Sequence, residues 1–101
     1  MAFISAGYVA DLAAGEVREI FVGERPYAIC NFEGSFYAMD GECPHQGGPL
    51  GQGRLDGVHL ACPYHLWAFD CRSGRCDRDR ECRVATYPVR IERGEILIEV
   101  P

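Results

Sequence analysis

Two short segments of the chain each place one cysteine and one histidine at the spacing of metal ligands. They read Cys43-Pro44-His45 and Cys62-Pro63-Tyr64-His65, with sixteen residues between His45 and Cys62. Two thiolates and two imidazoles suit either tetrahedral Zn²⁺ or an iron–sulfur cluster. The candidate metal ligands are therefore Cys43, His45, Cys62 and His65.

The grouping of these ligands separates the two kinds of metal site. A C₂H₂ zinc finger takes its two cysteines from one segment and its two histidines from another. Here each segment carries one of each, which suits a [2Fe–2S] cluster with two histidines on one of its irons. On this interpretation Cys43 and Cys62 bind one iron, and His45 and His65 bind the other. A zinc-stabilised interaction domain without redox function is the alternative from a different class.

The stretch after the first segment is rich in glycine, with four glycines between residues 47 and 53. Because glycine has no side chain, its backbone can approach a sulfur atom closely and direct N–H groups toward it. We therefore expect this stretch to be a loop that lies against the metal site.

The composition is that of an acidic protein long enough for a single folded domain, residues 1–101. The net charge is −5, and residues 1–53 hold seven acidic residues but only two arginines. Because phosphate binding needs a basic surface, we do not expect nucleic acid as a partner. A basic protein partner fits this charge better.

The sequence gives no sign of a membrane segment or of export. No apolar run is long enough to span a bilayer, and no basic residue precedes Arg18, so a signal peptide is not expected. In the reducing cytoplasm that this predicts, six cysteines favour metal ligation over disulfides. Cys30 is expected to be a buried apolar residue, and a disulfide between Cys71 and Cys76 stays open. Cys82 has no predicted role.

Apolar and polar residues alternate over short stretches that are separated by turns, which is typical of β-strands. Glu33-Gly34 and Arg93-Gly94 have the composition of hairpin turns. No stretch repeats apolar residues with the period of a helix. The fold is therefore predicted to be all-β and antiparallel, with strands at residues 2–9, 16–22, 26–32, 35–39, 58–61, 83–85, 87–91 and 95–100.

In these two segments the sequence resembles the Rieske proteins, and within that family the small ferredoxins. Phe69-Asp70, Arg72-Ser73-Gly74 and Tyr87-Pro88-Val89 stand where such ferredoxins carry similar residues, and His65-Leu66-Trp67 resembles the ferredoxins of toluene monooxygenases. The resemblance implies a Rieske-type antiparallel β-sandwich or open barrel. In such a fold the two ligand loops project from one end as a cluster-binding subdomain.

The resemblance also implies a function as a soluble one-electron carrier without catalytic residues. Such a ferredoxin passes electrons from a flavin-dependent NAD(P)H reductase to the terminal oxygenase of aromatic hydrocarbon catabolism. A mononuclear oxygenase iron needs two further histidines, and after His45 and His65 only His59 remains, which we expect to be structural. The chain is therefore not expected to be the oxygenase itself. The alternative within the same chemistry is the small Rieske subunit of an assimilatory nitrite reductase.

A low reduction potential is a further implication of the resemblance. High-potential Rieske proteins carry an additional, disulfide-linked cysteine in each loop, where this sequence has Gly48 and Tyr64. They also place Ser and Tyr hydroxyls near the sulfurs, where this sequence has Trp67 and Phe69. Hydrogen-bond donors near sulfur stabilise the reduced cluster and raise its potential. Without them we expect a value of about −150 mV, at the low end of the Rieske range.

Overall fold

A computed structural model describes residues 2–44, 47–64, 67–78 and 81–101 of the chain. Within these residues the secondary structure consists almost entirely of short strands, and no helix is long and apolar enough to cross a membrane. The strands are β1 (Ala2–Tyr8), β2 (Val17–Val22), β3 (Arg25–Phe32), β4 (Ser35–Asp40), β5 (Arg54–Asp56), β6 (His59–Ala61), β7 (Ala68–Asp70), β8 (Thr86–Tyr87), β9 (Val89–Glu92) and β10 (Glu95–Val100). Single 3₁₀ turns occur at η1 (Val9–Asp11) and η2 (Leu50–Gln52).

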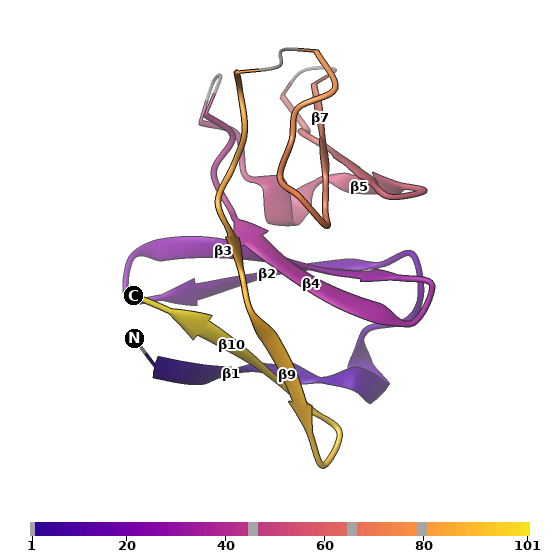
Figure 1. Cartoon of the computed structure of the whole chain (residues 1–101), viewed down its shortest axis with the longest axis vertical. Coiled ribbons are helices and arrows are strands. Elements are labelled where there is room, and N and C mark those ends of the chain that lie inside the picture. Colours follow the sequence, from indigo (N-terminus) through magenta and orange to yellow (C-terminus); the bar gives the residue numbers. More distant parts are fainter. Residues whose placement is uncertain (1, 45–46, 65–66, 79–80) are drawn as a thin grey trace.

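The strands form three antiparallel sheets in the part of the chain that the structure describes. Their orders are β1-β10-β9, β2-β3-β4-β8 and β5-β6-β7. The first two sheets lie together, and we call them the base. We call residues 41–84, which include the third sheet, the cap. Figure 1 shows the cap at one end of the molecule and the β9-β10 hairpin at the other. This is the predicted all-β antiparallel architecture with a separate unit projecting from one end.

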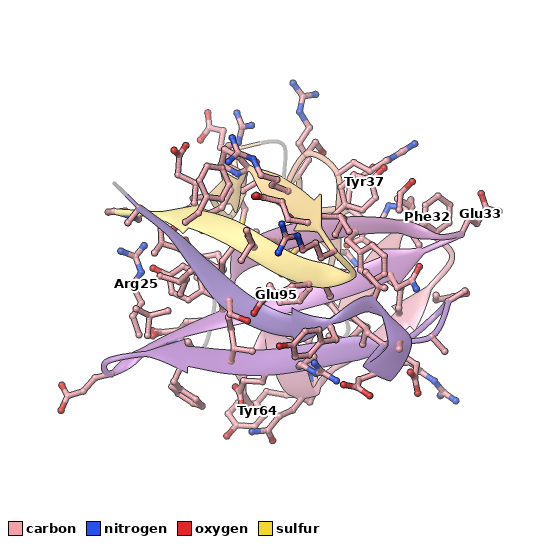
Figure 2. All side chains as sticks on the ribbon, turned by 90° about the horizontal axis from the view of Figure 1, so that it is seen from below. Arg25, Phe32, Glu33, Tyr37, Tyr64 and Glu95 are labelled. Atoms are coloured by element: carbon pink, nitrogen blue, oxygen red, sulfur yellow. The ribbon has the colours of Figure 1, made fainter. Side chains whose placement is uncertain are left out.

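Both predicted hairpin turns are confirmed. Glu33 and Gly34 have φ values of 53° and 91°, and Arg93 and Gly94 have values of 53° and 79°. Two successive positive φ angles are typical of the type I′ turn, whose twist matches that of the flanking strands. Figure 2 shows Glu33 at the tip of its hairpin, on the opposite side of the molecule from Arg25, where β3 begins.

Two hydrophobic cores meet at β3, whose residues are buried on both faces. Tyr27 and Ile29 belong to a core between the two base sheets, together with Ile96 and Ile98 of β10. The intervening residues belong to a second core, between the base and the cap. Side chains alternate between the two faces of a strand, so a strand between two cores is apolar throughout. The buried members of the second core are Ala28, Cys30, Met39, Cys43, Leu50, Leu60, Cys62, Phe69, Cys71, Cys76 and Val84.

The prediction of a strand at residues 83–85 is wrong, because these residues form no strand. Arg83 makes only an isolated bridge, to Arg75 of the cap. Two residues later, the Ala85 carbonyl accepts a hydrogen bond from Asp40 N–H in the base, at 3.0 Å. This segment runs from the cap to the base, so its successive residues meet different neighbours and build no continuous ladder.

Strand β5 is present although the sequence does not predict it. It covers only Arg54–Asp56 and pairs with β6 through Leu55 and Leu60. Three residues directly after a glycine-rich stretch are too few to show an alternating pattern. Strand β7 is likewise not among the predicted strands, and the strand predicted at residues 87–91 is divided at Pro88 into β8 and β9. The ends of the remaining strands differ from prediction by at most one residue, as for β4, which extends to Asp40.

Candidate metal centre

The two candidate cysteine ligands lie in the core between cap and base, although both are on loops. Cys43 follows β4 and is 1% exposed, and Cys62 follows β6 and is 3% exposed. Both belong to the same cluster of buried residues. The other two predicted ligands, His45 and His65, lie outside the described residues.

Each cysteine begins a loop that its own backbone N–H closes. Cys43 N–H donates to the Gly48 carbonyl at 2.8 Å, and Cys62 N–H donates to the Trp67 carbonyl at 2.9 Å. In the first loop Gly47 N–H also donates to the Cys43 carbonyl at 2.7 Å. Both loops therefore return to their starting point within a few residues, and the sequence positions of the histidines lie inside the two closed stretches.

The two loops touch each other at Gly48. A Cβ atom at this position would lie 2.6 Å from Cys62 Sγ and 3.2 Å from Tyr64 Cγ. Real Cβ atoms do not approach other atoms so closely, so only glycine fits here without movement. The predicted close approach of glycine backbone to sulfur is confirmed at this residue. Gly48 and Tyr64 also face each other, as expected of the positions that carry the bridged cysteines in high-potential Rieske proteins.

The outer surface of the two loops is open to solvent. Pro44 and Gly47 are exposed on the first loop, and Pro63 is exposed on the second. Tyr64 is 64% exposed, and its side chain projects outward (Figure 2). Trp67 packs against the core between cap and base. The cysteines thus lie on the inner side of the site, and Pro44, Gly47, Pro63 and Tyr64 lie on its outer side.

The described residues contain no group of three side chains able to bind a metal. A site of four ligands around Cys43 and Cys62 therefore needs ligands from outside the described residues, which is where the predicted ligands His45 and His65 lie. The third histidine, His59, is exposed on β6 and pairs in register with Asp56 and Asp70. Its position on a strand fits the expected structural role, which stays a prediction, and its exposure shows that it is not part of the buried core.

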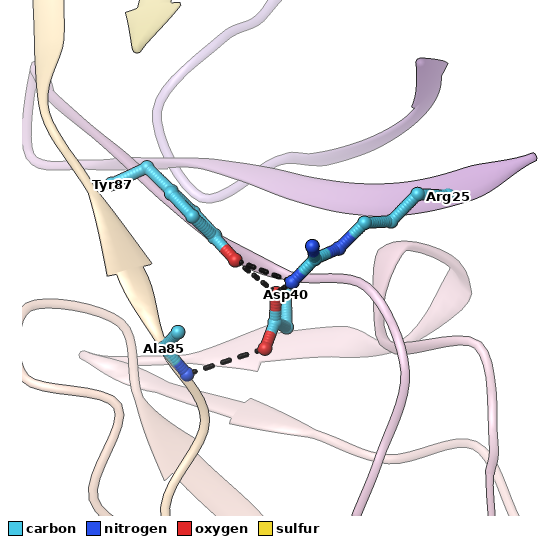
Figure 3. Close-up of polar contacts among 4 residues, drawn as sticks. All are labelled: Arg25, Asp40, Ala85 and Tyr87. Atoms are coloured by element: carbon cyan, nitrogen blue, oxygen red, sulfur yellow. Dashed lines mark hydrogen bonds and ion pairs between the residues drawn. The ribbon is translucent and has the colours of Figure 1, made fainter. Parts of the chain in front are cut away.

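A polar network around Asp40 connects the end of β4, where the chain enters the first loop, to the rest of the base (Figure 3). Asp40 Oδ1 accepts hydrogen bonds from the Tyr87 hydroxyl at 2.5 Å and from Arg25 Nη2 at 3.1 Å. Its Oδ2 accepts one from Ala85 N–H at 3.4 Å. Burial and the Asp40 carboxylate raise the pKa of Tyr87 above its ordinary value, so the hydroxyl keeps its proton and remains a donor.

Sequence reasoning missed this network because its members are far apart along the chain. Asp40 precedes Cys43 by three residues, but Arg25 and Tyr87 come from other strands. The only local signal is Asp40-Gly41, which marks the end of the β3-β4 hairpin. The bonds to Asp40 anchor the chain where the first loop begins.

Two of the remaining cysteines form a thiol pair between base and cap. Cys30 on β3 is buried as predicted, and its thiol lies beside that of Cys71, which is buried in the cap. The neighbouring Cys71 thiol and burial raise the pKa of Cys30. The chain contains no disulfide among its six cysteines, all of which the structure describes. The possible bridge between Cys71 and Cys76 is therefore absent.

Comparison with known proteins identifies the family. A family model described as Rieske [2Fe-2S] domain matches residues 2–88. The chain belongs to the Rieske [2Fe–2S] family.

The relatives of this Rieske domain include components of oxygenase systems. It is 36% identical, over 95% of its length and 80% of the relative's, to the ferredoxin component of the alkene monooxygenase system of Xanthobacter autotrophicus (strain ATCC BAA-1158 / Py2). It is 31% identical to the ferredoxin component of the naphthalene 1,2-dioxygenase system of Pseudomonas putida, over 97% of its own length and 95% of the relative's. In a solved complex of oxygenase and ferredoxin of carbazole 1,9a-dioxygenase, the matched chain has a TM-score of 0.88 at 26% identity. That match covers 95% of this chain and 91% of the other.

This Rieske domain carries a [2Fe–2S] cluster. The donor set fits that cofactor, because two buried cysteines lie on loops in direct contact and each loop holds one histidine in its sequence. Zinc as the resident metal is thereby set aside.

The contact at Gly48 gives a first prediction. In Gly48→Ala the added methyl group meets Cys62 Sγ and Tyr64, so the loops must separate. We expect less iron per purified chain and a loss of about 1–3 kcal/mol in the free energy of unfolding. Gly57→Ala is the control for iron content: it also costs stability, because alanine is strained at a φ of 60°, but no atom lies within 4 Å of its added Cβ and the ligand loops are not touched. Full iron content in Gly48→Ala would show that the loops do not need this close approach.

The core position of Phe69 gives a second prediction, about the reduction potential. Its ring is fully buried in the same core as Cys43 and Cys62. In Phe69→Tyr a hydroxyl is added in an apolar environment where sulfur is an available acceptor. A hydrogen bond to a charged acceptor is worth roughly 1.5–3 kcal/mol.

Only the part of this energy that differs between oxidised and reduced protein changes the potential. Taking a third to a half of it, and about 59 mV per 1.4 kcal/mol for one electron, the expected rise is on the order of 20–60 mV. Voltammetry on a variant with an unchanged visible spectrum measures it. A potential that stays constant or falls would mean that missing hydroxyl donors do not account for a low value in this protein.

Proposed function

We propose that this Rieske domain, residues 1–101, is the cytoplasmic ferredoxin component of a multicomponent oxygenase. It accepts single electrons from a flavin-dependent NAD(P)H reductase and delivers them to a terminal oxygenase that hydroxylates hydrocarbons. The observation that carries the proposal is the pair of contacting loops, with cysteines buried on the inside and exposed residues on the outside. When bound, the cluster takes up and releases one electron without making or breaking a substrate bond.

We assign Cys43 and Cys62 to one iron and His45 and His65 to the other. Burial of the two cysteines supports this division, because thiolates away from water suit the inner iron. The exposed residues Pro44 and Tyr64, which precede the two histidines in the sequence, support it from the other side, because a partner can approach the loops where their surface is open to solvent. The edge of the cluster nearest a partner is then the histidine edge. No residue of this chain has a catalytic role in this scheme.

The relatives favour an oxygenase partner over the nitrite reductase alternative. The ferredoxin components at 36% and 31% identity belong to systems named for alkene monooxygenase and naphthalene dioxygenase. The segment His65-Leu66-Trp67 adds the resemblance to toluene monooxygenase ferredoxins, although its first two residues lie outside the described part of the chain. We therefore propose hydrocarbon hydroxylation, of aromatic compounds in particular, as the process that this carrier serves.

The ligand assignment is tested by exchanging each histidine in turn. The native protein should contain two irons and two sulfides per chain, and its reduced form should give an EPR signal with an average g below the free-electron value. His45→Cys or His65→Cys should move that signal toward an all-thiolate cluster or abolish it. His59→Cys makes the same change at an exposed position outside the site and should leave the signal intact. A Rieske signal that survives exchange of His45 or His65 would refute the assignment.

The carrier function is tested by reconstitution with a flavin-dependent NAD(P)H reductase and a terminal oxygenase, for which proteins encoded by neighbouring genes are the first candidates. Stopped-flow mixing with reductase and NAD(P)H should reduce the cluster, and the reduced protein should then be reoxidised by the oxygenase, with hydroxylated product. Cys62→Ser, which cannot hold the cluster, should support neither step. Electron delivery to a sirohaem nitrite reductase, with none to any oxygenase, would favour the alternative.

A further inference from the structure

Arginine is concentrated in one segment of this acidic protein. Five of the ten arginines fall within residues 72–83, whereas the whole chain has a net charge of −5. Those that the structure describes are all exposed, namely Arg72, Arg75, Arg78 and Arg83. Arg72 forms an ion pair with Asp70 at 3.1 Å. The hydrogen bond from the Arg72 guanidinium lowers the pKa of the Asp70 carboxyl. The other three make no ion pair with any carboxylate among the described residues.

Arg75 and Arg83 lie directly opposite each other in an antiparallel bridge. Directly opposed residues of an antiparallel pair present their side chains on the same face, within a few ångströms of each other. Like charges in this arrangement are destabilising. The contacts nearby are to Ser73, whose carbonyl accepts from Arg83 Nη2 at 3.4 Å and whose hydroxyl accepts from Arg75 N–H at 3.3 Å. Neither contact neutralises a charge.

The backbone, rather than any attraction between side chains, holds these arginines together. Gly74, with a φ of +79°, lies in the turn that comes directly before Arg75. Its N–H donates to the Asp70 carbonyl at 2.7 Å, and its own carbonyl accepts from Val84 N–H at 2.9 Å. A Cβ at Gly74 would lie 2.1 Å from the Val84 carbonyl oxygen, so the two segments are tightly packed. Main-chain hydrogen bonds and close packing thus keep the repulsive pair together.

The segment that begins at Arg75 runs along β7 toward the second ligand loop. Asp77 N–H donates to the Ala68 carbonyl at 2.9 Å, and Asp77 Oδ1 accepts from Ala68 N–H at 3.0 Å, so the segment after Arg75 runs beside β7. Residue 68 follows directly on Trp67, whose carbonyl closes the second loop. Figure 1 shows this segment reaching the same end of the molecule as the two ligand segments.

We propose that Arg75 and Arg83 form a docking surface for a carboxylate-rich surface of a protein that exchanges electrons with this chain. Guanidinium groups bind carboxylates through paired hydrogen bonds, and two carboxylates would relieve the repulsion between the arginines. The net negative charge of the chain does not prevent this, because charges separated by more than about 8 Å are screened at physiological salt. A long polyanion such as nucleic acid would meet the acidic remainder of the surface and is disfavoured.

The test compares two pairs of charge-removing substitutions. Arg75→Gln with Arg83→Gln removes the proposed surface. Arg90→Gln with Arg93→Gln removes the same charge from the β9-β10 hairpin at the far end of the molecule (Figure 1). The rate constants for reduction by the reductase and for oxidation by the oxygenase are measured by stopped flow at low and physiological salt, with EPR and potential as checks on the cluster.

At low salt we expect at least about a threefold lower rate constant in one of the two half-reactions for Arg75→Gln with Arg83→Gln, and a smaller difference at higher salt. The control pair should behave like the native protein. Arg75→Lys with Arg83→Lys keeps the charge and should restore most of the rate, which separates charge from packing. The half-reaction that slows identifies which partner carries the acidic surface.

The proposal rests on the function proposed above, and the two can fail separately. A native protein that exchanges electrons with neither partner refutes the carrier function. A native protein that does so, with equal rates for Arg75→Gln with Arg83→Gln and for the control pair, refutes the docking surface alone. A third outcome would favour a small-anion site. The native protein and the control pair would then bind inorganic phosphate saturably, and Arg75→Gln with Arg83→Gln would lose this binding without any change in electron-transfer rates. That result would also overturn the proposed docking surface.

Discussion

The burial of β3 on both faces holds the base and the cap together. One face of this strand carries Tyr27 and Ile29 into the core between the two base sheets. The other carries Ala28 and Cys30 into the core that contains both cysteine ligands. Since burial of apolar surface is the main favourable term in folding, neither unit is complete without the shared strand. The two cysteine ligands thus lie in a core that exists only because β3 packs against both the base and the cap.

Rigidity at the start of the first ligand loop depends on Asp40. Both of its carboxylate oxygens and its N–H are used, and the partners come from β3, from β8 and from the segment that returns from the cap. Reorganisation of the protein opposes rapid electron transfer, so an anchored loop serves a carrier better than a mobile one. At Gly48 the two loops brace each other, where high-potential relatives use a disulfide.

The features that could be predicted from the sequence are those set by neighbours along the chain. Glu33-Gly34 specifies a two-residue hairpin because both positions need positive φ, and the cysteine–histidine spacing specifies the kind of metal site. The features that could not be predicted join distant residues. Nothing local to Asp40 indicates Tyr87, and nothing local to Arg75 indicates Arg83. The strand expected at residues 83–85 failed for the same reason, since its alternating pattern is present but no continuous partner strand lies beside it.

The closure of each ligand loop by a backbone hydrogen bond has a consequence for how such carriers diverge. The hydrogen bonds from Cys43 to Gly48 and from Cys62 to Trp67 use only main-chain atoms. Their formation therefore does not depend on the identity of most side chains between them. Residues on the outside of the loops, such as Pro44 and Tyr64, can then be exchanged during evolution without loss of the scaffold. A lineage of these proteins can change the oxygenase it serves by altering a handful of surface positions, while the electron-carrying interior is inherited unchanged.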